Sequence, residues 1–398
     1  MTDFLISFAR FLSATYMNKG IFALSTGTFA LGITEFVIMG ILVSLARDMD
    51  VSVARAGDFI SAYASGVCVG AVLMLLFRRM PLKKMVLMLA AVITVGNALT
   101  ACAPGYWVML GSRFVAGLPH GAFFGVGAIV ARRLAEPGRE VSAVSYMIAG
   151  MTVATLAGVP IGTFITNSLS WRWAFTLVAL SGAVTFILAH MWLPSLPALP
   201  DNGFRHQFHF LRTLPPWLIF GSVIFAQTGL YCWYSYVDPQ LTTIAGFSTG
   251  DLSWLMVVAG FGMFAGNLVA GRLSDRFRPS AVAGGVMSGG VAVLVLIFFF
   301  FGIQWLAVIL LMAGTAALFA SGSPLQSSIV EYSKGGELLG GACIQIAYNG
   351  GNAIAAQIGA TVIDSGLGYR YVPLAGVPLV VIGAAIIYVL YFRYERRR

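Results

Sequence analysis

Residues 250–302 read GDLSWLMVVAGFGMFAGNLVAGRLSDRFRPSAVAGGVMSGGVAVLVLIFFFFG, and this stretch decides the fold class. It consists of two apolar runs, 250–272 and 280–302, separated by a short loop rich in arginine. A helix needs about 20 apolar residues to cross a hydrocarbon core about 30 Å thick, so each run is long enough. In lipid, every backbone group must be satisfied within its own segment, which favours helices. The stretch therefore predicts two transmembrane helices joined by a charged turn.

The rest of the chain has the same character. Of its 398 residues, 59% are hydrophobic and 10% are charged, whereas a soluble domain carries about 25% charged residues. The net charge of +9 falls mostly in short loops, which indicates membrane topology rather than nucleic-acid binding. We predict an all-α membrane protein with twelve transmembrane helices, at about 20–46, 57–77, 83–103, 107–130, 139–164, 171–193, 215–237, 250–272, 280–302, 305–326, 337–362 and 371–392.

The basic residues predict the orientation, because cytoplasmic loops carry an excess of Lys and Arg. With the N-terminus in the cytoplasm, 19 of the 24 basic residues lie on the cytoplasmic side. Arg113 lies inside a span, and the four on the opposite side are Arg47, Arg55, Arg172 and Arg370. We therefore expect a multi-pass protein of a bacterial inner membrane with both termini in the cytoplasm.

A polar stretch near the middle divides the chain into two pseudo-symmetric six-helix bundles. The loop within 70–84 and the loop within 266–279 occupy equivalent places in the two halves, as in transporters built from internal repeats. Met17 is an alternative start of the chain. The predicted segments are an N-terminal cytoplasmic extension at 1–19, bundles at 20–193 and 215–392, a cytoplasmic linker at 194–214 and a basic tail at 393–398.

The loop of the second half carries the first resemblance to a known family. It reads Gly271-Arg-Leu-Ser-Asp275-Arg276-Phe-Arg278, which resembles the pattern G-x-L-x-D-R-x-G-R of the major facilitator superfamily, with Arg278 in place of the later glycine. The equivalent loop of the first half keeps only the basic pair Lys83 and Lys84. The resemblance implies a gating loop formed by Gly271, Asp275, Arg276 and Arg278.

Further segments resemble the drug/proton antiporters of this superfamily. The fourth span contains Gly111-Ser-Arg113-Phe-Val-Ala-Gly117-Leu-Pro-His120-Gly121, and the fifth contains Gly158-Val-Pro160-Ile-Gly162. Thr34-Glu35-Phe36 and the run that begins at Pro119 are similar to the sugar-efflux branch. The resemblance covers nearly the whole chain after residue 19.

This resemblance implies a transporter rather than an enzyme. The fifth-span motif implies secondary active efflux by alternating access, with protons entering as an arabinose-like sugar or a small amphipathic solute leaves. A proton symporter or uncoupled facilitator that imports its solute, and a multidrug exporter, remain alternatives on the same fold. The expected partners are the solute, protons and the lipid bilayer, with no nucleic acid, for a monomer. We expect no cofactor and no metal, and the sequence has no P-loop for ATP.

Three titratable residues inside spans are the candidates for proton coupling: Glu35, Arg113 and His120. Charged groups in hydrocarbon are costly, so they normally face a cavity or a partner. At about 1.5 Å per residue, Glu35 lies about 15 Å deep, between Arg113 at about 10 Å and His120 at about 21 Å. The alternative is a permanent Glu35–Arg113 pair that only fixes two helices. The second half offers no equivalent charge, and Gln227 occupies the place of the acid.

Neutral polar and aromatic side chains of the second half are the candidates for solute binding. Amides can hydrogen-bond to hydroxyl groups, and aromatic rings can pack on apolar faces of a ligand. Asparagines in spans can instead bond between helices, and the same residue types suit amphipathic drugs. In the fifth span, Gly158 and Gly162 permit close packing and Pro160 bends the helix. The solute-binding candidates are Gln227, Tyr231, Tyr234, Gln326, Gln345, Tyr348, Asn349 and Asn352.

Overall fold

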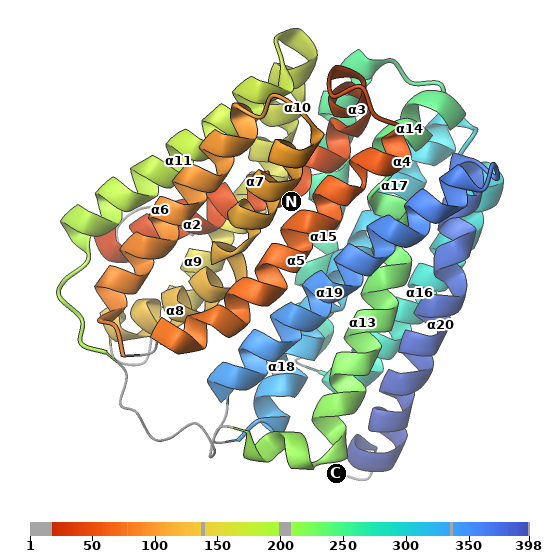
Figure 1. Cartoon of the computed structure of the whole chain (residues 1–398). Coiled ribbons are helices and arrows are strands. Elements are labelled where there is room, and N and C mark those ends of the chain that lie inside the picture. Colours follow the sequence, from red (N-terminus) through yellow and green to blue (C-terminus); the bar gives the residue numbers. More distant parts are fainter. Residues whose placement is uncertain are drawn as a thin grey trace, which may run out of the picture.

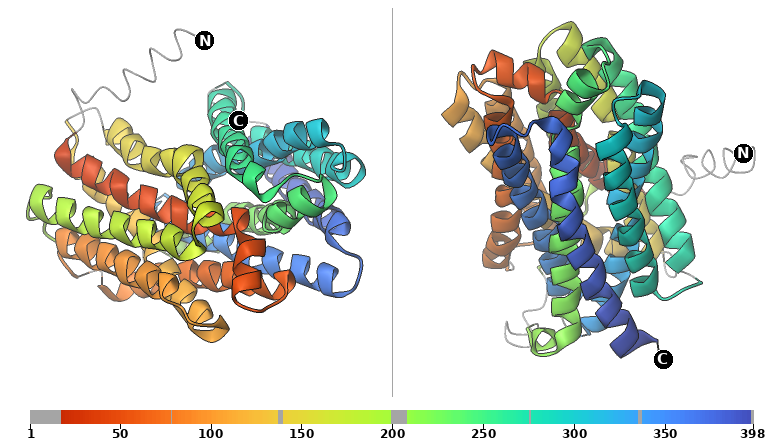
Figure 2. Two further views of the ribbon diagram at one scale, coloured as in Figure 1. Left: turned by 90° about the horizontal axis from the view of Figure 1, so that it is seen from above. Right: turned by 90° about the vertical axis from the view of Figure 1, so that its right-hand side faces the viewer.

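The computed structural model describes residues 18–77, 79–136, 140–198, 208–274, 276–334 and 337–396. Within these residues all regular structure is helical, and the helices form two groups that lie side by side (Figures 1 and 2). Three predicted segments fall partly outside the described residues: 1–17 of the extension, 199–207 of the linker and 397–398 of the tail.

The first group of helices, red to yellow-green in Figure 1, contains the first six predicted spans. Side-chain caps fix several helix starts, since Asn18 accepts a hydrogen bond from the Gly20 N–H and Ser170 accepts one from the Arg172 N–H. Its elements are α2 (Lys19–Phe36), η1 (Val37–Gly40), α3 (Leu42–Asp48), α4 (Val53–Ala56), α5 (Asp58–Leu73), η2 (Met74–Phe77), α6 (Leu82–Ala101), α7 (Tyr106–Gly117), α8 (Pro119–Leu134), α9 (Glu140–Val153), η3 (Ala154–Gly158), α10 (Val159–Ser168) and α11 (Trp171–Trp192).

The second group, green to blue, contains the other six. Proline stands in the first turn of α13, α16 and α20, where its missing N–H costs no helical hydrogen bond. The elements are η4 (His209–Arg212), α13 (Leu214–Tyr234), α14 (Val237–Pro239), η5 (Gln240–Ile244), η6 (Thr249–Asp251), α15 (Leu252–Ser274), α16 (Pro279–Phe300), α17 (Gln304–Ala320), α18 (Gly322–Tyr332), α19 (Glu337–Asp364), η7 (Tyr369–Tyr371), α20 (Val372–Leu390) and η8 (Tyr391–Glu395).

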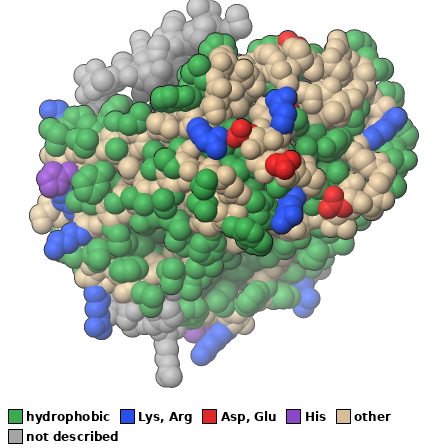
Figure 3. All heavy atoms as spheres, turned by 45° about the horizontal axis from the view of Figure 1, so that its top comes forward, with side chains coloured by type: hydrophobic (Ala, Val, Ile, Leu, Met, Phe, Trp, Pro, Cys, Tyr) green, Lys and Arg blue, Asp and Glu red, His purple; other side chains and the backbone are tan. Residues whose placement is uncertain are grey.

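Ten helical segments of the described residues are long and apolar enough to cross a membrane. Helices α13 and α19 have 21 and 28 residues, so they are also long enough to cross a membrane. These helices together confirm the twelve predicted spans. Large apolar side chains are exposed between the charged ends of the molecule (Figure 3), for example Trp107 at 73% exposure, as expected for a surface that faces lipid.

The first span differs from the single helix predicted at 20–46. Helix α2 ends at Phe36, tightens into the 3-10 turn η1 and is interrupted at Ile41 before α3 begins. Gly40 is tightly packed at this interruption, since a Cβ there would lie 2.9 Å from the Thr163 hydroxyl oxygen. The regular helix ends at Phe36, one residue beyond Glu35.

The fifth span is also irregular. It passes from α9 through one π-helical turn, η3, into α10, and so continues to Ser168, beyond the predicted end at residue 164. Pro160 lies in the first turn of α10, after the π turn. The irregularity predicted from Pro160 thus begins one turn earlier, at Ala154, since proline leaves the preceding turn without its regular hydrogen bond.

The two groups meet along α5 and α19, along η3, α10 and α15, and through α3 and α14. We call the end of the molecule that carries α3 and α14 the α3–α14 end. Five hydrogen bonds between the groups join a side chain to a backbone atom: Val43 N–H to Asp238, Ser61 to the Ala353 carbonyl, Cys68 to the Ile346 carbonyl, Asn167 to the Thr249 carbonyl and Tyr236 to the Ala54 carbonyl. Most of them lie toward the α3–α14 end, so the halves are held together there.

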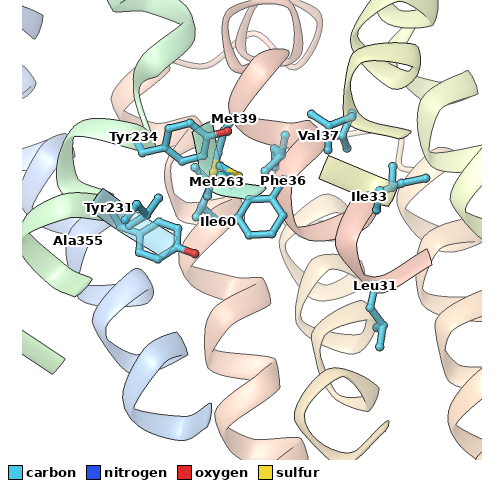
Figure 4. Close-up of a cluster of buried hydrophobic side chains, with 14 of the residues drawn as sticks. Leu31, Ile33, Phe36, Val37, Met39, Ile60, Tyr231, Tyr234, Met263 and Ala355 are labelled. Carbon is cyan, nitrogen blue, oxygen red and sulfur yellow. The ribbon is translucent and has the colours of Figure 1, made fainter. Parts of the chain in front are cut away.

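A hydrophobic cluster fills the space between the groups (Figure 4). Phe36 of α2 packs on Phe319 of α17, with ring centroids 5.5 Å apart. Tyr231 and Tyr234 reach into the same cluster from α13. Two of the three aromatic side chains predicted to contact solute, Tyr231 and Tyr234, therefore lie at the seam between the halves.

Candidate functional site

Glu35 lies in the last turn of α2 and is only 6% exposed. Its Oε2 atom is 3.8 Å from Nε2 of His120, which lies in the first turn of α8. The depth estimate from the sequence therefore brings together two of the three predicted coupling residues. In this part of the chain, a buried acid faces a buried imidazole inside the membrane.

His120 connects Glu35 to a residue that sequence reasoning missed. Its Nδ1 atom is 2.8 Å from the hydroxyl oxygen of Tyr63 on α5. When the hydroxyl donates to Nδ1, the proton of the neutral ring sits on Nε2, where it faces the carboxylate. Glu35, His120 and Tyr63 thus form a row of three side chains that can each bind or release a proton. The sequence feature that could have indicated Tyr63 is a polar hydroxyl within the predicted span 57–77.

Arg113 is completely buried at the end of α7. Its guanidinium donates to the Thr34 hydroxyl at 3.0 Å and to the Phe59 carbonyl at 3.4 Å, and it lies 4.4 Å above the Tyr63 ring. The Thr34 hydroxyl in turn donates to Asn97 at 2.6 Å. Among the described side chains, His120 rather than Arg113 lies within ion-pair distance of Glu35, so the alternative of a direct Glu35–Arg113 pair does not match this arrangement.

Arg113 still acts on Glu35 through space, since their charges interact electrostatically. One guanidinium nitrogen of Arg113 has no hydrogen-bond partner among the described residues. The electrostatic attraction between a buried guanidinium and a nearby carboxylate depends on the local dielectric, so it changes when water enters or leaves the site. Glu35 and Arg113 thus place a buried acid and a buried, permanently charged base in the same part of the first half.

The predicted solute-binding residues fall into three sets. Tyr231 and Tyr234 are buried and lie within electrostatic range of Glu35. Gln227 is instead tied to the neighbouring helix, because its amide donates to the Ser321 hydroxyl at 3.2 Å and to the Leu318 carbonyl at 3.4 Å. The side-chain amide of Gln326 on α18 lies beside Gly341 of α19, and no described contact brings it to Glu35.

The third set lies on α19 and has unused hydrogen-bonding capacity. The Asn349 amide donates to the Gln345 carbonyl at 3.1 Å. The side-chain oxygens of Tyr348, Asn349 and Asn352 are buried and have no hydrogen-bond partner among the described residues. Buried polar atoms are normally paired, so these three are the groups best prepared to receive a polar ligand.

The fifth-span glycine motif is buried between helices, whereas the arginines of the predicted gating loop are exposed. Gly158 packs against α2, where a Cβ would lie 2.5 Å from Ile33, and Gly162 packs against η1, where a Cβ would lie 2.6 Å from Val37. In the predicted gating loop, Gly271 lies in α15, and Arg276 and Arg278 are exposed. Asp275 lies outside the described residues, so the predicted aspartate of this loop has no structural account here.

One acid of the second half is buried although it was not among the candidate site residues. Asp238 of α14 is 1% exposed, which corrects the expectation that this half carries no buried charge comparable to Glu35. Hydropathy does not reveal this burial, because Asp238 lies in a three-residue helix just beyond the predicted span 215–237. No group of three or more His, Cys, Asp or Glu side chains could hold a metal ion in the part of the chain that the structure describes.

Two six-helix groups with a titratable cluster at their seam are typical of alternating-access transporters. The sequence profile of the Major Facilitator Superfamily matches residues 24–337 and 219–398, and the chain belongs to this family. It is therefore a multi-pass membrane transporter and not an enzyme.

Three relatives within this family indicate a branch to which the chain is similar. The chain is 41% identical over 383 residues to "Putative transporter AraJ" of Escherichia coli (strain K12), covering 96% of this chain and 97% of the relative. It is 33% identical to "Inner membrane transport protein YdhP" of the same organism, with 94% and 95% covered. It is 28% identical to a "Probable sugar efflux transporter" of Helicobacter pylori (strain ATCC 700392 / 26695), with 88% and 90% covered. The resemblance to the sugar-efflux branch is thus confirmed.

Solved structures show the same fold. A bacterial homolog of the human lysosomal transporter Spinster, in an inward-facing and unoccupied conformation, superposes with a TM-score of 0.72 at 14% identity. The superposition covers 95% of this chain and 98% of that one.

Proposed function

We propose that the protein is a proton-coupled exporter that moves a sugar-like solute across the membrane by alternating access. The observation that carries this proposal is the buried chain of Glu35, His120 and Tyr63 beside the seam between the halves. Tyr231 and Tyr234 reach this seam from the opposite half. A proton on Glu35 and a solute near these tyrosines would therefore act on one central site.

The coupling follows from the cost of a buried charge. A carboxylate that loses its proton in a closed, dry site pays a desolvation penalty, and a hydrated carboxylate does not. Glu35 therefore takes up a proton before the site closes and releases it when the site reopens to the other side. His120 and Tyr63 hold the carboxyl and offer the proton a route, while Arg113 supplies a fixed charge.

A hydroxylated solute fits the unused polar atoms of α19. The oxygens of Tyr348, Asn349 and Asn352 can accept hydrogen bonds from sugar hydroxyls, and the two tyrosine rings of α13 offer apolar faces. The printed name of the Helicobacter relative points to the same class of solute. A multidrug exporter would need fewer paired polar groups and a more apolar site.

The excess of basic residues favours an orientation with both termini in the cytoplasm, in an inner membrane like that named for YdhP. The α3–α14 end is then the outer end, and the described state is closed toward the outside. We assign gating to Gly271, Asp275, Arg276 and Arg278 and bending to the π turn before Pro160. A monomer is sufficient, and the proton gradient is the energy source, with no cofactor.

The test uses purified protein in liposomes that contain a pH-sensitive dye. Gradients of arabinose, other sugars and efflux drugs are imposed in turn on wild type, on Glu35→Gln and on the exposed-carboxylate control Asp364→Asn. We expect a sugar gradient to drive proton movement in wild type and in the control, and Glu35→Gln to abolish it.

Sugar flux without proton movement in all three proteins would show a facilitator. Movement of sugar and protons in the same direction would show a symporter. A response to drugs alone would show a multidrug exporter, and each of these outcomes would overturn the proposal.

A further inference from the structure

Asp238 joins the two halves at the α3–α14 end. Its Oδ2 atom accepts a hydrogen bond from the backbone N–H of Val43 on α3, at 2.9 Å. Asp238 belongs to the second half and Val43 to the first, so this contact exists only while the halves are closed at this end. Opening that end would break the bond and expose the carboxyl to water.

The other carboxyl oxygen has no such partner. The Oδ1 atom of Asp238 is buried and makes no hydrogen bond to the described residues. A charged carboxylate with one orphaned, desolvated oxygen is much less stable than a neutral carboxyl in the same place. The closed structure therefore favours a proton on this side chain.

Among the described residues, no cationic side chain forms a salt bridge or a hydrogen bond with Asp238 to offset this burial. The elements that mainly pack against α14 are α3, η1 and η5, and the last two carry no titratable side chain. On α3, Asp48 is paired with Arg172 at 2.5 Å, and Arg47 lines an open hollow beside it. Tyr369 of η7 interacts electrostatically with Asp238.

We propose that Asp238 is a second proton-binding site of the transporter, which takes up a proton when the halves close over it and releases it when the α3–α14 end opens. The site is separate from Glu35 and does not depend on the solute. Protonation of Asp238 accompanies the closing of the two halves, whether or not solute is bound.

The direction of the effect follows from the two environments. Asp238 lies beyond the predicted span 215–237, and burial raises its pKa to about 7, although the Val43 N–H opposes this. In the open state the hydrated carboxyl has an ordinary pKa near about 4. Closing therefore binds a proton between these values, so acid stabilises the closed state and this stabilisation is lost as pH rises through about 7.

The test measures closure directly. Spin labels on Leu169→Cys and Thr243→Cys, two exposed positions on opposite halves at this end, report their separation in lipid nanodiscs after the exposed Cys102 is replaced by Ser. Measurements run from pH 8 to pH 5 in the Glu35→Gln background, so that titration of Glu35 contributes nothing. We expect the ratio of closed to open molecules to rise between tenfold and about a hundredfold as pH falls.

Asp238→Asn is the matched variant, because its amide oxygen can still accept from Val43 while it cannot titrate. We expect its closed population to be independent of pH over the same range. A pH response that persists in Asp238→Asn, or the lack of one in the protein with Asp238, would overturn the proposal. Neither result depends on whether Glu35 couples solute to protons, so the two proposals fail separately.

Discussion

Gly260 of α15 packs directly on the backbone carbonyl of Thr155, within the π turn of the fifth span. A Cβ on Gly260 would lie 2.2 Å from that carbonyl oxygen, and the two residues belong to opposite halves. The absence of a side chain at residue 260 is therefore a condition for closing the halves at this point.

Gly260→Ala tests this condition. We expect it to destabilise the closed state by about 1–3 kcal/mol, because the added methyl group would overlap a backbone atom that cannot move freely. The label pair at residues 169 and 243 should report more open molecules. Gly289→Ala is the matched control, since its Cβ would meet no atom within 4 Å; equal populations in both variants would contradict the prediction.

Tyr63→Phe removes the hydroxyl that bonds to His120 and keeps the ring beneath Arg113. A buried group left without its partner costs about 1–3 kcal/mol. We expect proton-driven transport to slow at least severalfold, while exchange of solute for solute continues, because exchange needs no proton transfer. Tyr106→Phe is the control, since it likewise loses one hydroxyl hydrogen bond to a titratable side chain, that of Asp58. A parallel fall of exchange and proton-driven transport in Tyr63→Phe would indicate a purely structural hydroxyl.

Tyr348→Phe removes a buried hydroxyl that has no partner among the described residues. We expect unchanged thermal stability, because no hydrogen bond of the folded chain is lost. The KM for the solute should rise by about tenfold if the hydroxyl contacts it, as for a lost ligand hydrogen bond of about 1.4 kcal/mol. Tyr236→Phe should behave in the opposite way, with lower stability, since its hydroxyl donates to the Ala356 carbonyl at 2.8 Å. An unchanged KM in Tyr348→Phe would remove this residue from the binding site.

Asp48 provides a pH test on the surface. Hydrogen bonds from Arg172 and Trp171 hold the pKa of Asp48 below its usual range, so its contribution to stability is present above about pH 4 and is lost as pH falls through the lowered value. The side chain is 47% exposed, so this contribution is under about 1 kcal/mol. We expect Asp48→Asn to lower the Tm slightly at pH 6 and by less as the pH is lowered through the acidic range. A Tm difference that does not shrink as the pH falls would assign the effect to geometry rather than charge.

The sequence predicted the spans and placed Glu35 between Arg113 and His120 in depth, because hydropathy and the helical rise determine length and depth. These rules do not determine side-chain direction. Arg113 has a suitable depth to pair with Glu35, yet its guanidinium reaches Thr34, one residue earlier on α2. Rotamers and neighbouring helices decide such choices, and neither can be read from periodicity.

The same limit applies to the irregular segments. Ile41 and the turn at Ala154–Gly158 interrupt spans that read as continuous apolar runs, because the tight packing of Gly40 and the missing N–H of Pro160 leave no trace in hydropathy. Asp238 was not among the candidate residues for a similar reason: its short element α14 and the neighbouring η5 leave no hydropathy signal. Hydropathy therefore describes these irregular segments less well than it describes the regular spans.

Five of the hydrogen bonds between the halves have a backbone atom as one partner, among them Val43, Ala54 and Ala353. A backbone N–H or carbonyl persists whatever side chain the residue carries. Residues at these positions can therefore diverge among relatives without a compensating change across the seam. A search for correlated substitutions among relatives would therefore detect few of these contacts, although they hold the α3–α14 end closed.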